Sequence, residues 1–217
     1  MATRLAASAD SGHAGQSAAP PAAAGTTTRR RGPALTRAIY RVAFEELARH
    51  GFDALAFDKL ARRAQTGKSV LYRRWSTPAE LLLAALTDPV EGFGDPPTPD
   101  TGTLRGDLRT LLGNLARVLD EPRGKALILL MTDRGRPPEL VSTVRERVIL
   151  PNQTILIGCL RAAAARGEAD PACVTPLVAS VGPRMILTES MDKGHVTGDD
   201  VAAIVDQVLL PLTAPRR

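Results

Sequence analysis

The fold is decided by the stretch AFDKLARRAQTGKSVLYRRW, residues 56–75. Apolar residues recur at three- and four-residue spacing on both sides of residues 65–67, which predicts two short helices at residues 57–64 and 68–75. Trp75, with apolar neighbours, is expected to close the core between them. Two short helices joined by a turn of three or four residues form a helix-turn-helix unit.

Helices are also predicted on both sides of this unit. Residues 34–50 carry apolar side chains at helical spacing, and Gly51 follows as a residue that can take positive φ and end the helix. The segment TPAE, residues 77–80, has the pattern of a capped N-terminus, with Thr as N-cap and Pro at the first helical position. A further helix is therefore expected over residues 79–90. These elements predict an N-terminal domain over residues 33–93.

The rest of the chain reads as a second, purely helical domain over residues 94–217. Alanine, leucine, arginine and valine are abundant while aromatic residues make up only 3%, and no strand-like alternation occurs. Further helices are predicted at residues 103–119, 123–132, 138–166, 175–193 and 198–209. Residues 1–32 are rich in Ala, Gly, Ser, Pro and Thr and are expected to form a disordered tail with a basic end. The predicted fold class is all-α.

The charge is unevenly distributed. Residues 29–75 contain twelve Lys or Arg and four acidic residues, a net charge of +8, which leaves −3 for the rest of a chain whose total is +5. Lys59, Arg62 and Arg63 are expected on the outer face of their helix. A basic module joined to a mildly acidic one indicates that the first part binds a polyanion, with nucleic acid as the leading candidate. Residues 29–31 could lie in a minor groove or form a basic linker.

Several other classes of protein are disfavoured. No apolar run approaches the roughly 18 residues that a membrane span needs, and the N-terminus has no apolar signal region, so a cytoplasmic protein without membrane partners is expected. The segment TGKS at residues 66–69 imitates the end of a phosphate-binding loop, but the first glycine position is Arg62, inside a helix. His13, His50 and His195 are scattered. An enzyme, a metal site and a cofactor are therefore not expected.

A family resemblance is carried by the residues of the first domain. The pattern runs from Ile39-x-x-Val42-Ala43 through Gly51-Phe52-Asp53-Ala54, Leu60-Ala61-x-x-Ala64 and Lys68-Ser69-Val70-Leu71-Tyr72-x-x-Trp75 to Glu80-Leu81. It resembles the DNA-binding domain of tetracycline-repressor-type transcriptional regulators. The segments at residues 99–108 and 165–168 are similar to the C-terminal domain of an actinobacterial branch of that family.

The resemblance implies a homodimer that places two recognition helices in the major grooves of a palindromic operator in double-stranded DNA. It also implies a C-terminal domain that binds an unknown small-molecule effector and a repressor that the effector releases from the operator. Because both half-sites must be contacted at once, a modest rotation of the subunits would break both contacts. The two last predicted helices are the expected dimer interface by the same resemblance.

Seven residues are the predicted DNA contacts. Those near base edges are Thr66, Lys68, Ser69 and Arg73, and those on phosphates are Arg37, Tyr72 and Arg74. The chain departs from the family pattern at Ala56, Gln65, Gly67 and Pro78. Ala56 and Pro78 remove usual phosphate contacts. Gln65 and Gly67 replace the usual Gly and Ser of the turn, which moves the flexible residue by two positions.

The C-terminal domain leaves two interpretations open. Its apolar stripe either packs solidly, which would make the protein a constitutive DNA binder that only dimerises, or encloses a ligand pocket. Polar and soft side chains inside that domain are the candidates for orienting a ligand. These are Thr132, Asn152, Gln153, Arg184, Met185 and Glu189.

Overall fold

The computed structural model describes residues 32–96, 98–132 and 137–216. Every regular element in these residues is helical, so the all-α prediction is confirmed. The predicted tail, with its basic end at residues 29–31, lies outside the described residues except for Gly32, where the first helix begins.

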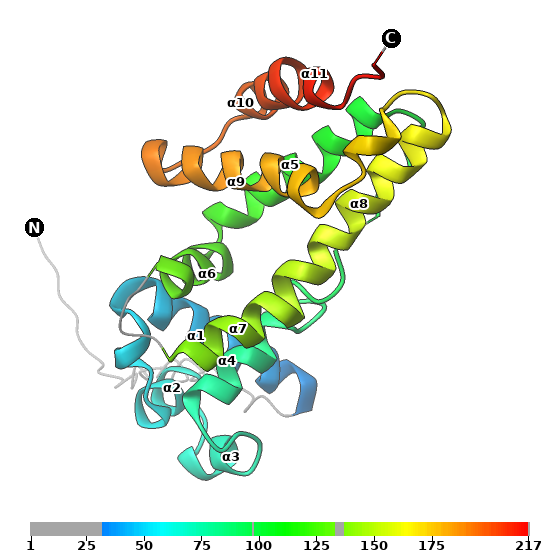
Figure 1. Ribbon diagram of the computed structural model, residues 1–217. Coiled ribbons are helices and arrows are strands. Elements are labelled where there is room, and N and C mark those ends of the chain that lie inside the picture. The colour runs from blue at the N-terminus through cyan, green and yellow to red at the C-terminus, as the bar shows by residue number, and fades with distance from the viewer. Residues whose placement is uncertain (1–31, 97, 133–136, 217) are drawn as a thin grey trace, which may run out of the picture.

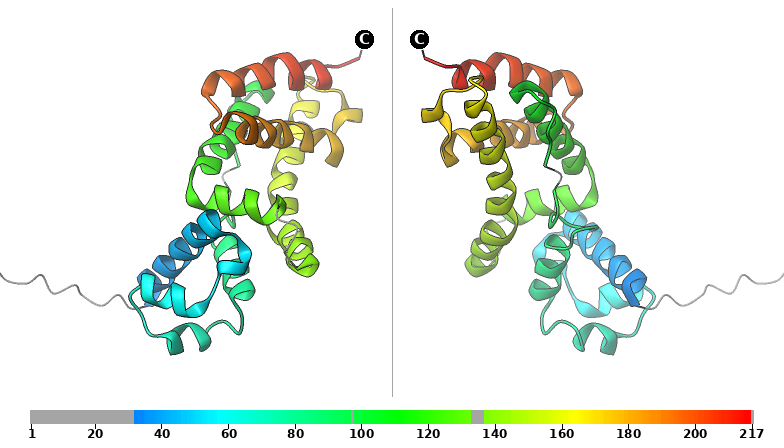
Figure 2. Two further views of the ribbon diagram at one scale, coloured as in Figure 1. Left: turned by 90° about the vertical axis from the view of Figure 1, so that its left-hand side faces the viewer. Right: turned by 90° about the vertical axis from the view of Figure 1, so that its right-hand side faces the viewer.

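The helices follow one another along the chain as Figure 1 shows. In the first part they are α1 (Gly32–His50), the 3-10 turn η1 (Phe52–Ala54), α2 (Phe57–Arg63), α3 (Lys68–Tyr72) and α4 (Pro78–Leu86). In the second part they are α5 (Leu104–Asp120), α6 (Pro122–Thr132), α7 (Pro138–Val144), η2 (Arg145–Ile149), α8 (Leu150–Ala165), η3 (Pro171–Cys173), α9 (Pro176–Lys193), α10 (Gly198–Ala203), η4 (Ile204–Leu209) and α11 (Leu210–Thr213). Helices α1–α4 lie at one end of the molecule and α10 and α11 at the other, with α5 and α8 running between them (Figures 1 and 2).

The hydrophobic core at the α1–α4 end draws on the second half of the chain. Ala126 and Leu130 of α6 and Leu140 and Val144 of α7 are buried in the same cluster as the inner faces of α1–α4. A separate cluster fills the space between α5, α8, α9 and α10. The packing therefore crosses the boundary predicted at residue 93, because α6 and α7 complete the first core.

Two prolines shape the long helices of the second half. Helices α7, η2 and α8 form one continuous helix, as predicted, and so do α10, η4 and α11. The π-helical turns η2 and η4 end at Ile149 and Leu209, two residues before Pro151 and Pro211. A proline inside a helix has no N–H to donate and clashes with the carbonyl four residues earlier, and a wider turn relieves that clash without ending the helix.

The start of α4 follows the prediction and its end does not. The Thr77 hydroxyl accepts a hydrogen bond from the Glu80 N–H at 3.1 Å, as an N-cap does. The helix ends at Leu86, one turn before the predicted Val90. Because Pro89 disfavours the helical conformation at Asp88, the chain turns there, and the Asp88 carboxylate accepts hydrogen bonds from the N–H groups of Val90 and Glu91.

The continuous helix Pro138–Ala165 is long and apolar enough, by length and composition, to cross a membrane, although the sequence contains no unbroken apolar run of that size. In the folded chain α8 packs against α5 and α9. Several of its apolar residues, among them Ile149, Ile155 and Leu156, line an interior pocket. Packing and the pocket lining thus account for part of its apolar composition, since 28% of the apolar window is buried.

Candidate DNA-binding surface and pocket

The turn between α2 and α3 is a Schellman motif. Gln65 takes the left-handed conformation at φ 56°, its N–H donates to the Arg62 carbonyl at 3.2 Å, and the Thr66 N–H donates to the Ala61 carbonyl at 2.9 Å. Gly67 has φ −80°, which any residue can adopt, and precedes α3 as its N-cap. The expected relocation of the flexible residue to position 67 is therefore wrong, because Gln65 itself takes the strained conformation.

Two of the basic residues expected on the outer face of α2 turn inward instead. Arg63 forms ion pairs with Glu45 and Glu46 of α1, and Lys59 approaches Glu46 to 2.5 Å. Glu46 is buried, with 2% of its side chain exposed. Burial raises the pKa of Glu46, but the hydrogen bonds and positive charges of Lys59 and Arg63 outweigh burial and hold the pKa below its usual value. Only Arg62 of the three is exposed, so the outer face is less basic than predicted.

The predicted contacts at the start of α3 lie together. Thr66 is half-buried, while Lys68 and Ser69 are exposed in the first turn of the helix. Lys68 forms an ion pair with Asp58 of α2 at 2.8 Å, and its ammonium lies 5.6 Å from the Tyr72 ring. Any contact from Lys68 to DNA competes with this pair.

Tyr72 is held by packing at the end of α3. Its ring meets the Phe57 ring edge to face, with centroids 4.8 Å apart, while 54% of the residue remains exposed. This arrangement fixes the direction of the side chain and leaves the phenol on the surface. The geometry suits a hydroxyl that hydrogen-bonds to a phosphate.

The arginines that follow α3 differ in their surroundings. The Arg74 guanidinium donates to the Thr36 hydroxyl of α1, and Arg37, which follows Thr36 in the chain, is exposed on the same helix. Arg73 is exposed and makes no ion pair within the described part of the chain. Trp75 is a core residue as predicted, with 7% exposure and its ring 5.8 Å from that of Tyr40.

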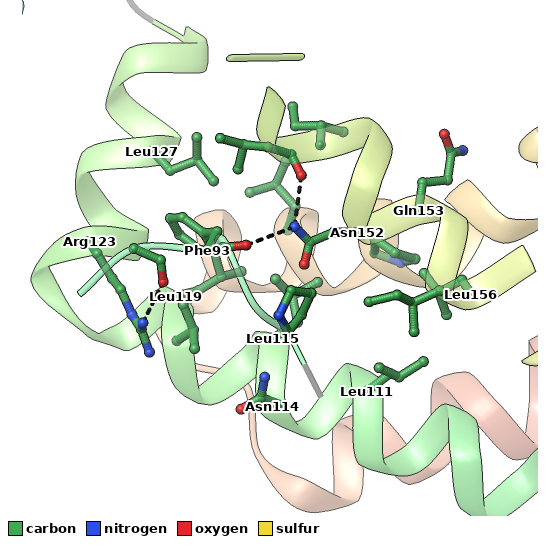
Figure 3. A pocket seen from close by; sticks show the side chains of 18 of the residues that line it. Phe93, Leu111, Asn114, Leu115, Leu119, Arg123, Leu127, Asn152, Gln153 and Leu156 are labelled. Atoms are coloured by element: carbon green, nitrogen blue, oxygen red, sulfur yellow. Dashed lines mark hydrogen bonds between the residues drawn. The ribbon is translucent and has the colours of Figure 1, made fainter. Parts of the chain in front are cut away.

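A pocket of about 590 Å³ lies within the second half of the molecule (Figure 3). Its walls come from α5, α6, η2, α8, α9 and the segment at residues 89–96. Most of the lining is apolar, and Leu111, Leu115, Leu119, Leu127 and Leu156 surround the space. A volume of this size is typical of small-molecule sites.

Four of the six predicted ligand residues line this pocket. They are Thr132, Asn152, Gln153 and Arg184. The other two lie elsewhere. Met185 packs against the cluster between α5, α8, α9 and α10, and Glu189 pairs with Lys193 at 2.6 Å. Both are on α9, but on faces that turn away from the pocket.

The segment at residues 89–96 is fixed by side-chain contacts that sequence reasoning missed. Arg123 donates to the Gly92 carbonyl at 2.6 Å, and the Asn152 amide donates to the Phe93 carbonyl at 3.3 Å (Figure 3). Glu91 pairs with Arg41 of α1 through two contacts of 2.6 and 2.7 Å. These partners are 31 to 59 residues apart in sequence, so no local pattern could have found them.

Known protein families match both the helix-turn-helix part of the chain and the part that holds the pocket. The model described as "Bacterial regulatory proteins, tetR family" matches residues 39–85, and "Tetracyclin repressor-like, C-terminal domain" matches residues 98–208, more than half of the chain. The chain belongs to the tetracycline-repressor family. It is thus a DNA-binding transcriptional regulator of the helix-turn-helix type.

Individual members of the TetR family resemble the whole chain. A DNA-binding transcriptional repressor TetR of Mycobacteroides abscessus is 31% identical over 185 residues, which cover 85% of this chain and 97% of that protein. The solved structure of TylP, a TetR regulator from Streptomyces fradiae, has a TM-score of 0.65 at 21% identity and covers 85% of this chain and 89% of its own. FadR from Bacillus subtilis, solved with stearoyl-CoA, has a TM-score of 0.60 at 18% identity over 83% of this chain and 98% of its own.

The two C-terminal segments that resemble a branch of the TetR family meet in space. The buried Asp107 carboxylate accepts hydrogen bonds from the Thr101 N–H and hydroxyl, both at 2.8 Å. Glu168 accepts the Leu104 N–H at 2.6 Å and pairs with Arg166 at 2.5 Å. These contacts join the start of α5 to the end of α8, so the shared residues build a structural clamp.

Gly106 is required inside this clamp. A Cβ atom at Gly106 would lie 2.2 Å from the Thr101 hydroxyl oxygen, which is far closer than van der Waals contact allows.

Within the described residues no cluster of three His, Cys, Asp or Glu side chains is arranged to hold a metal ion.

Proposed function

We propose that the protein is a homodimeric repressor that leaves a palindromic operator when a small molecule occupies the pocket. The observation that carries this proposal is the position of the pocket walls. Helix α6 lines the pocket on one side and is buried against α1 on the other, and residues 89–96 continue directly from α4. A molecule in the pocket therefore touches elements that are packed against the DNA-binding unit.

The pocket also favours ligand response over constitutive DNA binding. A C-terminal domain that served only for dimerisation would be expected to have a closed core. The cavity of about 590 Å³ instead has the size and apolar lining of a ligand site. The strength of release would be limited by the difference in ligand affinity between the operator-bound and released conformations.

The dimer would form through α9 and α11. Leu177 and Met191 are 70% and 55% exposed, and they are fourteen residues apart, which places them on one face of α9. Leu212 of α11 is 44% exposed. Exposed apolar side chains of this size gathered on two neighbouring helices are typical of an interface. Glu substitutions at Leu177 and Met191 should convert the dimer to a monomer in sedimentation analysis.

DNA recognition would rest on α3 and the start of α1, with Arg37, Thr66, Lys68, Ser69, Tyr72, Arg73 and Arg74 as the contacting residues. We expect the protein to act in the cytoplasm. We also expect it to bind DNA without catalysing a reaction.

Selection from random double-stranded DNA with the full-length chain at moderate salt tests the operator part of the proposal. The expected product is a palindrome, bound at least about a thousandfold more tightly than random sequence. Binding without sequence preference would contradict specific repression.

The release part is tested with N-phenyl-1-naphthylamine, an apolar fluorescent molecule. By linkage, if the probe weakens operator binding, the operator must weaken probe binding by the same factor. Equal probe affinity with and without operator would favour the constitutive binder.

A further inference from the structure

Positively charged side chains outnumber negatively charged ones in the lining of the pocket. Four are arginines, Arg117, Arg123, Arg145 and Arg184, whereas Asp95 is the one acidic lining residue in the part of the chain that the structure describes. A cationic ligand would therefore meet four guanidinium groups and a single carboxylate. Charge complementarity favours an acidic ligand.

Two of the four arginines already have an ion-pair partner within the protein. Arg117 and Arg123 both pair with Glu121, and Arg123 also donates to the Gly92 carbonyl. Arg145 and Arg184 form no ion pair within the described residues. They come from η2 and α9, and both are exposed as well as pocket-lining. They therefore stand where the pocket opens to solvent.

The interior of the pocket has a different polarity. The Asn152 amide nitrogen donates to the Val148 carbonyl at 2.7 Å, and the Gln153 amide nitrogen donates to the Pro176 carbonyl at 2.5 Å. The Asn152 amide also donates to the Phe93 carbonyl, so both of its N–H groups are engaged and it offers a ligand only its acceptor oxygen, whereas Gln153 has used one of its two N–H groups. An anionic group placed deep in the pocket would meet leucines, the Asn152 oxygen and an Arg123 guanidinium that already pairs with Glu121, so its stable position is at the mouth.

We propose that the effector is an apolar molecule with an acidic group, bound with its apolar body inside the pocket and its acid at the mouth, where Arg145 and Arg184 supply positive charge. This inference rests on the proposed effector function and adds the chemical class of the ligand. Guanidinium groups suit the task because they hold a carboxylate through paired hydrogen bonds.

Two matched fluorescent probes test the inference with the full-length chain. 8-Anilinonaphthalene-1-sulfonate and N-phenyl-1-naphthylamine share one ring system and differ by the sulfonate. The parent protein should bind the sulfonate probe more tightly. Because salt screens charges at the mouth, that preference should shrink as ionic strength rises, while binding of the neutral probe stays constant.

Arginine variants locate the effect. Arg145→Gln and Arg184→Gln should each weaken binding of the sulfonate probe about three- to tenfold, the range of a solvent-accessible charge contact, and change the neutral probe less than twofold. Arg147→Gln is the matched control, because Arg147 is exposed two residues further along the same helix and does not line the pocket. It should leave both affinities unchanged. Sedimentation should give the same oligomeric state for all variants.

The outcomes separate this inference from the proposed function. If the neutral probe binds as tightly as the sulfonate, or if Arg145→Gln and Arg184→Gln act no differently from Arg147→Gln, the acidic class is wrong while a ligand pocket stands. Leu115→Trp, which fills the pocket, should weaken both probes. If it weakens neither and a thermal melt shows that the variant is folded, the pocket does not take apolar molecules, and both proposals fail.

Discussion

Arg41 and Glu91 form a two-point ion pair that joins α1 of the DNA-binding unit to the segment lining the pocket. The two side chains differ in exposure, with 66% for Arg41 and 9% for Glu91. The carboxylate therefore depends on its partner far more than the guanidinium does.

This asymmetry predicts unequal costs for removing either partner. Arg41→Met leaves a nearly buried charge without a counterion and should lower the free energy of unfolding by about 1–2 kcal/mol. Glu91→Gln keeps an acceptor and should cost less than about 1 kcal/mol. A double-mutant cycle in urea measures both, and the double variant should recover part of the loss. Equal costs for the two single variants would contradict the burial argument.

Arg73 is expected to read the operator. Arg73→Ala should weaken specific binding by about 1–3 kcal/mol, roughly five- to 150-fold, and relax the preference at one base position. The matched control is Arg49→Ala, which removes the same charge near the opposite end of α1 from Arg37, about 18 Å along the helix axis. Electrophoretic mobility shifts on the selected site compare them. If both variants lose the same affinity, Arg73 acts only through net charge.

Gln65 is expected to be a point of stored strain. A non-glycine residue at φ 56° costs on the order of 1 kcal/mol, so Gln65→Gly should raise the thermal midpoint even though glycine gains entropy in the unfolded chain. Gly67→Ser should keep or raise the midpoint, because position 67 has an ordinary φ and serine is a good N-cap. A loss of stability in Gly67→Ser would show that the turn needs its glycine there.

The clamp between α5 and α8 yields a pair of glycine variants on one helix. Gly106→Ala should be strongly destabilising, because the new Cβ would lie 2.2 Å from the Thr101 hydroxyl oxygen. Gly113→Ala meets nothing within 4 Å and should stabilise by up to about 1 kcal/mol through helix propensity. Asp107→Ala should cost about 1–3 kcal/mol, because it leaves the Thr101 N–H and hydroxyl without their acceptor. Urea unfolding of the three variants checks the order, and similar shifts for the two glycine variants would contradict the clamp.

Acid should destabilise the fold through Glu46 and Glu168. The pKa of each carboxyl lies below its ordinary value of 4.5, for Glu46 because Lys59 and Arg63 outweigh burial and for Glu168 because of hydrogen bonds from Arg166 and the Leu104 N–H. The unfolded chain therefore takes up protons first as the pH falls. The stability that these groups contribute is complete above about pH 4.5 and is lost as the pH drops through their folded pKa values.

Thermal midpoints between about pH 6 and pH 2.5 measure this loss. Glu46→Gln should flatten the dependence, whereas Glu146→Gln, exposed and outside the ion pairs of the described residues, should keep the parent slope. An unchanged slope in Glu46→Gln would remove Glu46 as a cause.

Sequence reasoning succeeded where the signal is local. Helical periodicity, the Thr77 cap and the end of α1 at Gly51 each depend on residues within one or two turns. Sequence reasoning failed where the position of a side chain depends on partners that are distant in the chain. Arg63 and Lys59 turn to Glu46 instead of outward, and the pattern of α2 alone could not show that a buried carboxylate lies beside it.

The pocket illustrates the same limit. Periodicity places Arg184 and Met185 on α9 but does not say which face of α9 meets which partner. Arg184 lines the pocket, while Met185 packs into the core with α5 and α10. Gly92 and Phe93 read as the end of a domain because they lie in a Pro- and Gly-rich segment, yet their carbonyls are held by Arg123 and Asn152 in the pocket wall.

Helices α6 and α7 complete the hydrophobic core of α1–α4, and this limits where the chain can be truncated or fused to another protein. A fragment ending at residue 93 would expose the apolar surface that Ala126, Leu130, Leu140 and Val144 cover. A chimera that takes the α1–α4 unit from another regulator must therefore also take the matching α6 and α7 surfaces, or these surfaces must be redesigned. The part that can be exchanged between regulators is therefore α1–α4 together with α6 and α7, and its boundary with the rest of the chain runs through a packed hydrophobic core.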